Sequence, residues 1–472
     1  MKSPSHRSRL FLLLLTLFLI PTALLAEWGD PSGFFDREKI ERKELHPGVI
    51  WWSIGGQLNG KPLKTNLLTV DLAKSDLQAK TLVGERFVSL KTGQRFQRSR
   101  VSQLLDDNEV LAAINASFFD ISATMAPMGL TMQDGMIFRE PSGRTSLVLS
   151  TDGRAALGSP EWSAQIEAGS QRRPLNGINK PSLSNNEINL YQLPWAASPG
   201  NSTPFTENQK VREIVLEKID FRPATRGSER SELTGRITEI RDNKAGVEIG
   251  ENQFVLTATE NAAPFFRNVR VGHHLTVSWE LTNLPSGFDF HGVREIVSSS
   301  PVLITNGKVE SRASSLWTAS HPRSAIGISR DQTKLAVVLI DGRSAQSVGV
   351  SLHDLANFLL HLGSYNAINF DGGGSSALAA VVDGKSTVLN SPSGGSERYV
   401  PTGLGIAVVD GSLSGSRTWT GANGRQLKGV FQNYNPQTGY VTLVLAGRRY
   451  TIPIDSLSAD DQALIRAHTN TD

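Results

Sequence analysis

Two aspartates directly follow apolar runs, at points where strands are expected to end. Residues 335–340 lead into Asp341, and residues 366–370 lead into Asp371. If these strands are parallel, both carboxylates leave the carboxyl edge of one sheet, where ligands bind in α/β sheets. Asn115 joins them if the apolar run before it forms a strand in the same direction. Two carboxylates and an amide at one edge suit sugar chemistry, because one carboxyl group can act as acid or nucleophile and the other as base.

Aspartate followed by glycine is chiefly a turn dipeptide, so each occurrence has to be judged by its context. Asp134-Gly135 and Asp383-Gly384 lie between strand-like residues and are interpreted as hairpin turns. After Asp341 a helix is expected rather than a returning strand, and Asp371 precedes three glycines, more than a tight turn needs. We therefore predict catalytic roles for Asp371 and Asp341.

A run rich in glycine and serine follows Asp371, namely Gly372, Gly373, Gly374, Ser375 and Ser376. Such a run can turn several backbone N–H groups and two hydroxyls toward one anionic oxygen. It lacks both the Gly-Lys-Ser/Thr ending and the spaced glycines of nucleotide-binding loops. A flexible linker is the alternative, but it does not fit a position directly after a buried strand. We predict that these five residues bind substrate.

Basic side chains near the same strands are candidates for binding a phosphate. Arg323 precedes the apolar run 325–328, and an arginine there can hold phosphate oxygens through paired hydrogen bonds. An arginine in such a position is more often simply solvated, and the same two interpretations apply to Arg343 and Arg398. His321 is either a proton donor or a structural hydrogen-bonding residue. No dense cluster of His and Asp indicates a metal site, and no cofactor is expected.

The elements around these residues predict the fold class. Between the two aspartates, Ser351 can cap a helix whose apolar residues recur at helical spacing up to Gly363. Strand, helix and strand in this order predict a βαβ unit whose parallel strands are neighbours or near neighbours. Residues 48–138 indicate strands and hairpins, 170–210 a long irregular connection, and about 211–284 an inserted β-rich module. The expected class is α+β, with a mixed β-sheet as its core.

The C-terminal part is predicted to be a separate domain. Glycines and serines at 411–416 are typical of a flexible linker. Residues 417–472 indicate four or five short strands and a closing helix. This pattern resembles the small SH3-like homology domain first described in a yeast cytoskeletal protein. The resemblance implies a small β-barrel and a protein or cell-surface partner.

Residues 1–26 have the layout of a secretory signal peptide, with an uncleaved anchor as the alternative. Three cations precede an apolar run at 10–20 that is short for a membrane span, and Pro21 leads to Ala26. The leader holds three of the 48 Lys and Arg and no acid, which leaves 45 residues of each sign. We expect an exported protein, periplasmic or secreted, with no nucleic acid partner and no integral membrane segment. Because the chain has no cysteine, disulfides and thiolate sites are excluded.

Four ordered blocks resemble the phosphodiester glycosidase family, whose members remove a sugar from a sugar-1-phosphodiester. The blocks are Asn115 to Phe119, His321 to Gly327, Asp341 to Arg343 and Asp371 to Ser376. Further matches are Gly177-Ile178-Asn179, residues 301–303, residues 306–308, and Arg398 with residues 401–405. The resemblance covers residues 48–410, and Ser117 stands where the family usually has glycine.

The resemblance implies a hydrolase that cleaves the glycosidic bond of a sugar-1-phosphodiester, of N-acetylhexosamine type, and releases sugar and a phosphomonoester. It implies that Asp371, with Asp341 as its partner, performs the acid–base or nucleophilic step. Arg323 with Arg398 would hold the phosphate, and Asn115 would bind sugar or phosphate. Two alternatives stay open. One is a non-catalytic protein that binds envelope glycans, and the other is a phosphodiesterase that breaks the other P–O bond, a reaction that commonly needs metal.

Overall fold

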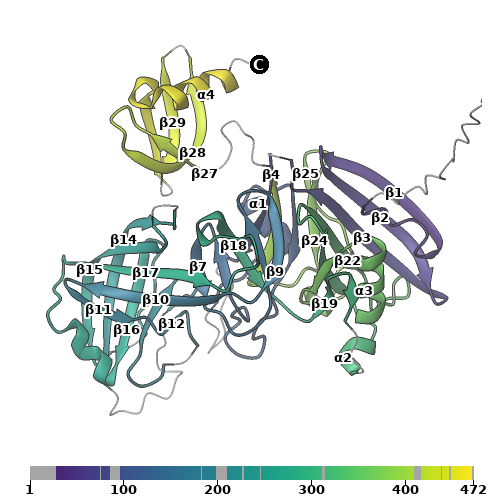
Figure 1. Cartoon of the computed structure of the whole chain (residues 1–472), viewed down its shortest axis with the longest axis horizontal. Helices are drawn as coiled ribbons and strands as arrows, with labels where there is room; N and C mark the ends of the chain where they lie inside the picture. The colour runs from purple at the N-terminus through teal and green to yellow at the C-terminus, as the bar shows by residue number, and fades with distance from the viewer. Residues whose placement is uncertain are drawn as a thin grey trace, which may run out of the picture.

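The computed structural model is mostly β, with strands in several sheets and a few short helices (Figure 1). It describes residues 28–74, 76–85, 96–181, 183–197, 210–225, 228–244, 246–310, 314–408, 416–436, 438–445 and 448–469. The predicted leader and, apart from residue 416, the predicted linker lie outside these residues. Within them, no helix is long and apolar enough to span a membrane. The expected α+β class is wrong, because packed sheets rather than helices build the cores.

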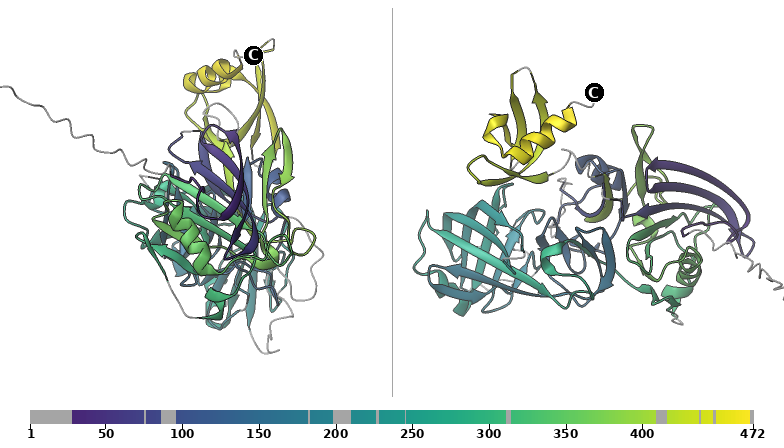
Figure 2. Two further views of the ribbon diagram at one scale, coloured as in Figure 1. Left: turned by 90° about the vertical axis from the view of Figure 1, so that its right-hand side faces the viewer. Right: turned by 45° about the horizontal axis from the view of Figure 1, so that its top comes forward.

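An eight-stranded antiparallel sheet, the main sheet, contains the strands that lead into Asp341 and Asp371. In spatial order its strands are β1 (Asp36–His46), β2 (Val49–Leu58), β3 (Lys61–Asp71), β22 (Lys334–Ile340), β21 (Arg323–Ile328), β23 (Asn366–Asn369), β19 (Val302–Thr305) and β20 (Lys308–Val309). The first three strands are long and curve together at one side of the molecule (Figure 2).

The centre of this sheet is buried on both faces, which explains its continuous apolar runs. In β22, Val337 faces one core and Val338 faces another. The second of these cores is covered by α3 (Leu352–His361). This helix begins as predicted, because Ser351 Oγ accepts from the N–H of Asp354 and the carboxylate of Asp354 accepts from the N–H of Ser351.

The predicted βαβ unit is wrong. Helix α3 does connect β22 to β23, but β21 lies between these two strands and pairs antiparallel with both. β22 and β23 therefore run in the same direction without being hydrogen-bonded to each other. As a result, the end of β22, the start of β21 and the end of β23 meet at one edge of the sheet. Local periodicity predicts the helix and its two strands, but not the strand that comes to lie between them.

A five-stranded sheet packs against the other face of the main sheet. Its order is β25 (Lys385–Val388), β24 (Leu378–Val382), β5 (Ala112–Asn115), β26 (Thr402–Val408) and β4 (Leu77–Val83). Ile114 and Leu378 face the core shared with β22, whereas α1 (Val101–Asp107) covers the opposite face. The Asp383-Gly384 turn joins β24 to β25, as predicted.

A second five-stranded sheet and a second eight-stranded sheet lie between these elements in the sequence. The smaller sheet has the order β7 (Met136–Arg139), β6 (Thr131–Gln133), β18 (Val293–Ser298), β8 (Ser146–Ser150) and β9 (Arg154–Gly158), and Asp134-Gly135 forms the predicted turn. The larger has the order β11 (Gln171–Pro174), β10 (Glu161–Ala168), β17 (His274–Thr282), β15 (Ser231–Asp242), β14 (Val211–Arg222), β16 (Gln253–Thr259), β13 (Ile188–Gln192) and β12 (Gly177–Ile178).

The larger of these two sheets forms the β-rich module. Two short helices, η1 (Glu260–Phe266) and η2 (Phe290–Gly292), lie beside this sheet and belong to the module. Its core contains the buried rings of Phe254, Phe266 and Trp279. The module starts earlier than expected, because it includes strands from the region predicted to be irregular.

The C-terminal residues form a meander with a small core of its own. The elements are β27 (Ser416–Thr420), β28 (Gln426–Asn435), β29 (Tyr440–Leu445), β30 (Arg448–Pro453), η4 (Ile454–Ser456) and α4 (Ala459–Thr469). Trp419, Val441 and Ile465 pack together in this core. The strand pairs found in the described residues follow sequence order and give an open sheet, so the predicted SH3-like barrel is not supported.

Candidate functional site

Glycines allow the loops to pack closely at the edge where β22, β21 and β23 meet. A Cβ on Gly342 would lie 2.6 Å from the nitrogen of Pro322, and one on Gly372 would lie 2.9 Å from the oxygen of Pro322. Gly349, with φ of +89°, lies against the backbone of His321. Larger residues would push these loops apart, so the glycines set the geometry of the edge.

Asp371 leaves this edge as a partly buried carboxyl group. Its backbone N–H donates to the oxygen of Ala116 (2.8 Å), which joins the loop to the end of β5. Burial raises the pKa of Asp371 to about 6, against the opposing effects of a hydrogen bond from Ser375, the charge of Arg398 and the N–H of Gly372. A carboxyl group with this pKa exchanges its proton close to neutral pH, which suits acid–base or nucleophilic chemistry.

Two guanidinium groups rest against the glycine loop. A Cβ on Gly373 would lie 2.9 Å from Nη2 of Arg343, and one on Gly374 would lie 2.5 Å from Nη2 of Arg398. Arg398 also donates from Nη1 to Ser375 Oγ (3.1 Å), and both arginines are exposed to solvent. Two cations therefore lie against the loop, an arrangement suited to binding an anion. Of the two, Arg398 acts by its charge on the Asp371 carboxyl group.

The glycine loop itself is not an open nest. In and after η3 (Gly373–Ser375), the N–H groups of Gly373, Ser375 and Ser376 donate to protein carbonyls at 2.9, 3.2 and 3.3 Å. These three N–H groups are already paired within the protein, so they do not point at a ligand, and substrate binding by the rest of the loop stays a prediction. Ser376 is buried, and its hydroxyl has no hydrogen-bond partner among the residues that the structure describes.

Asp341 faces the loop that follows β25. The residue is 4% exposed, and its carboxylate accepts from Asn390 Nδ2 (3.1 Å) and from the N–H of Ser391 (3.1 Å to each oxygen). Burial raises the pKa of Asp341, and these hydrogen bonds and the charge of Lys64 oppose the rise. Asp371 and Asp341 share one edge, but neither is among the charges that shift the pKa of the other.

Sequence reasoning does not find Asn390 and Ser391. A polar pair after a hairpin strand is too common to mark a site, and its contact with Asp341 spans about fifty positions of the chain.

Asn115 is fully buried and joins three segments of the protein. Its Nδ2 donates to the oxygen of Asp371 (2.6 Å), while its Oδ1 accepts from Ser324 Oγ (2.8 Å) and the N–H of Ala377 (3.2 Å). The structure thus brings Asn115 to Asp371, but as a support for the loop rather than as a group that faces a ligand.

Arg323 is buried as well, with 4% of its surface exposed. It donates from Nε to the oxygen of Val350 (3.1 Å) and from Nη2 to the oxygens of Leu316 (3.3 Å) and Ala319 (2.7 Å). These bonds tie α2 (Ser315–Thr318) to the residue before the α3 cap. Burial lowers the pKa of Arg323 to about 10. Nε and Nη2 of Arg323, the residue predicted to bind phosphate, therefore already donate to carbonyl oxygens of the protein.

His321 is partly exposed at the same edge. Burial lowers its pKa, and the charges of Arg323 and Arg343 lower it further. His321 is therefore neutral at pH 7 and can donate or accept a hydrogen bond. Across the described residues, no group of three or more His, Asp or Glu side chains is arranged to hold a metal ion.

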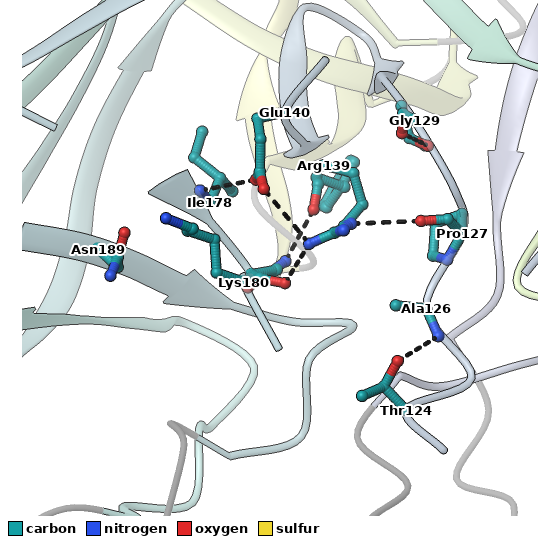
Figure 3. A network of polar contacts seen from close by, with 12 residues as sticks. Thr124, Ala126, Pro127, Gly129, Arg139, Glu140, Ile178, Lys180 and Asn189 are labelled. Atoms are coloured by element: carbon teal, nitrogen blue, oxygen red, sulfur yellow. Dashed lines mark hydrogen bonds and ion pairs between the residues drawn. The ribbon is translucent and has the colours of Figure 1, made fainter. Parts of the chain in front are cut away.

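Figure 3 shows how Arg139 fastens β12 to the loop after β5. Arg139 donates from Nε to the oxygen of Pro127 (3.3 Å) and from Nη1 to the oxygen of Asn179 (2.6 Å). Glu140, beside it, accepts from the N–H of Ile178 (3.0 Å). The Gly-x-Asn segment noted in the sequence therefore anchors the module to the loop that begins at the end of β5.

The sequence comparisons match the part of the chain that carries this site. Residues 231–407 match the family model of phosphodiester glycosidase, a stretch that includes Asp341, Asp371 and Arg398 but not Asn115. The SPbeta prophage-derived uncharacterized protein YomE of Bacillus subtilis (strain 168) is 38% identical over 111 residues, which are 23% of this chain and 16% of that protein.

Two solved structures have a similar fold. A hypothetical protein from Synechocystis has a TM-score of 0.56 at 20% identity, over 78% of this chain and 63% of its own. A Burkholderia pseudomallei K96243 protein, named as exported, has a TM-score of 0.58 at 17% identity, over 78% of this chain and 96% of its own. The chain spans less than two thirds of the Bacillus and Synechocystis proteins. It is thus a mostly β protein with a region that matches phosphodiester glycosidases.

Proposed function

We propose that this protein hydrolyses the glycosidic bond of a sugar-1-phosphodiester, of N-acetylhexosamine type, and releases sugar and a phosphomonoester. The observation that carries the proposal is Asp371, a carboxyl group with a pKa of about 6, at the start of a glycine loop against which the guanidinium groups of Arg343 and Arg398 lie. A phosphodiester carries one negative charge next to the bond to be broken. The site offers both a base or nucleophile and an anion-binding pair. The family match over residues 231–407 supports the same reaction class.

In this reaction Arg343 and Arg398 hold the phosphate oxygens, and ionised Asp371 attacks the anomeric carbon or activates the attacking water. The bond between C1 and the phosphate oxygen breaks, the phosphate keeps the electron pair, and water supplies the new hydroxyl of the sugar. A phosphate ester leaves readily, so the reaction needs little protonation of the leaving group. Asp341 is then a positioning residue, because its carboxylate holds Asn390 and the next residue in place.

Asp371→Asn tests the assignment. We expect its turnover of UDP-N-acetylglucosamine and aryl sugar-1-phosphodiesters to fall by roughly 10²–10⁴-fold, the usual contribution of an acid–base group, without a change in the unfolding midpoint. Asp383→Asn is the matched control, because Asp383 stands in an exposed Asp-Gly turn and its loss should leave turnover unchanged. An Asp371→Asn variant that is stable and fully active contradicts the assignment.

Mass spectrometry of the products, with and without a chelator, tests the bond that is cleaved. Free sugar and phosphomonoester support the proposal. Sugar 1-phosphate shows cleavage of the other P–O bond, and activity lost with chelator shows a metal requirement. No product, together with saturable binding to envelope glycans, favours a binding protein instead.

We further propose that the protein is exported, to the periplasm or beyond, and acts there on sugar phosphates or envelope glycans. The layout of residues 1–26 and the similar fold of a protein named as exported support this location. The C-terminal unit, with its own core, is proposed to bind a protein or cell-surface partner.

A further inference from the structure

A cleft of about 430 Å³ lies in the module. It is formed by the start of β14, the end of β15 and η1. Its volume is in the range of small-molecule sites, about 300–1,000 Å³. Figure 1 shows β14 and β15 well apart from α3, β22 and β24, which surround the candidate active site. The cleft is therefore a second site and does not belong to the first.

Hydrogen bonds among the lining residues and to the backbone hold the lining of the cleft in place. Arg212 donates from two nitrogens to both carboxylate oxygens of Asp242, and from Nη1 to the oxygen of Phe266 (3.0 Å). The hydrogen bonding between the Arg212 guanidinium and the Asp242 carboxylate raises the pKa of Arg212 and lowers that of Asp242. Glu260 has φ of +45°, a left-handed conformation that is uncommon for such a residue, and its N–H donates to the oxygen of Lys210 (2.8 Å). Strained backbone of this kind often occurs at ligand sites.

Three polar side chains of the lining remain available to a ligand. Within the described residues, no hydrogen bond or ion pair involves Lys210 Nζ, the side-chain amide of Asn261 or the Arg267 guanidinium. All three residues are exposed. Because Arg212 and Asp242 neutralise each other, Glu260 is the one remaining acid among the described lining residues to oppose Lys210 and Arg267. The cleft therefore presents donors and acceptors side by side, with an excess of one positive charge.

We propose that this cleft binds an acidic saccharide unit. Sugar hydroxyls donate and accept, so they can pair with the amide, the carboxylate and the cations together. Ala263 and Pro264 add a small apolar surface against which the face of a sugar ring can pack. A polyphosphate carries several negative charges and is disfavoured, because the lining has an excess of only one positive charge. An apolar ligand would leave the polar groups unpaired. The single excess positive charge matches one carboxylate or similar anion on the sugar.

Calorimetric titration of the full chain tests the proposal with three probes: sialyllactose (an acidic trisaccharide with one carboxylate), neutral chitotriose and inorganic phosphate. We expect binding of the acidic trisaccharide, weaker at high salt, and at least tenfold weaker binding of the other two. Asn261→Ala and Arg267→Ala should each lower the affinity at least threefold. Arg173→Ala is the matched control, since Arg173 is an exposed arginine on β11 of the same sheet.

The result is independent of the catalytic proposal, because Asp371→Asn should bind the acidic trisaccharide as the natural chain does. Unfolding midpoints of the variants show that they remain folded. Equal affinity for chitotriose, tighter binding of phosphate alone, or affinities unaffected by Asn261→Ala and Arg267→Ala would each overturn the proposal, as would no binding at all.

Discussion

At the scale of single residues, the charge of Arg398 helps to set the proton affinity of Asp371. Arg398 lowers the pKa of Asp371 against the effect of burial, which raises it to about 6. Arg398→Ala should therefore raise this pKa further. Because Asp371 is proposed to act ionised, the acid limb of the kcat/KM profile should move to higher pH, and activity should fall more at pH 6 than at pH 8.

Arg398→Lys is the control for this prediction. It keeps the positive charge and should leave the acid limb in place, while KM rises because lysine cannot make paired hydrogen bonds to phosphate. The measurement is kcat/KM from pH 4.5 to 9 for the three proteins. An acid limb that stays fixed in Arg398→Ala would show that the two side chains are not coupled.

Residue type and order along the chain predict where the site lies better than they predict what each residue does. Asp371 and Asn115 come together as the sequence indicates, yet Asn115 binds groups more than 200 positions away instead of facing outward. Arg323 likewise gives its donors to carbonyls of neighbouring loops. Whether a polar side chain faces a ligand or the protein depends on such contacts, which no local pattern contains.

At the scale of elements, Arg323 connects α2 with the start of α3. Arg323→Leu removes a donor from three carbonyl oxygens, of which that of Val350 keeps the N–H of His321. At about 1 kcal/mol or more for each of the other two, the free energy of unfolding should fall by roughly 2 kcal/mol. Hydrogen exchange in residues 315–319 should also become faster. Denaturant unfolding and exchange mass spectrometry measure both effects.

The surface ion pair of Arg222 with Asp220 supplies the matched control for Arg323. Arg222→Leu should change the free energy of unfolding by less than about 1 kcal/mol, as is usual for exposed pairs. If Arg323→Leu instead keeps its stability and only raises KM, then Arg323 binds substrate and its structural role is refuted.

Local signals predict single elements well, and the pairing of strands much less. The Ser351 cap of α3 and both Asp-Gly turns are confirmed, because neighbouring residues alone determine them. The place of β21 between β22 and β23 depends on contacts across the whole sheet. The polar strand β11 and the two-residue strand β12 lie in a region predicted to be irregular, since short strands at the edge of a sheet carry little apolar periodicity.

At the scale of the whole molecule, Glu295 joins the two five-stranded sheets. From β18 it accepts from the N–H of Thr81 in β4 (2.9 Å) and from the N–H of Asp134 in the β6–β7 turn (2.9 Å). Burial raises the pKa of Glu295 to about 8, with a further rise from Asp134 and an opposing effect from Lys80. At neutral pH the folded protein therefore holds a protonated carboxyl group between these sheets.

This raised pKa makes the free energy of unfolding depend on pH. In the unfolded chain Glu295 ionises near 4.5, so between about 4.5 and 8 only the folded state binds the proton. Its stabilisation is complete below pH 4.5 and is lost at about 1.4 kcal/mol per pH unit as the pH rises to about 8. Glu295→Gln cannot ionise, so the stability of the natural chain relative to this variant should fall across that window.

Denaturant unfolding at pH 5, 6.5 and 8 measures this dependence. At pH 5 the natural chain should be the more stable, because the amide of Gln leaves one of the two N–H groups without an acceptor. Its advantage should shrink or reverse by pH 8. Glu161→Gln, at an exposed position on β10, should leave the pH dependence unchanged. If the difference between the natural chain and Glu295→Gln stays constant with pH, Glu295 is ionised when folded, and the two sheets are joined by a charged group instead of a neutral one.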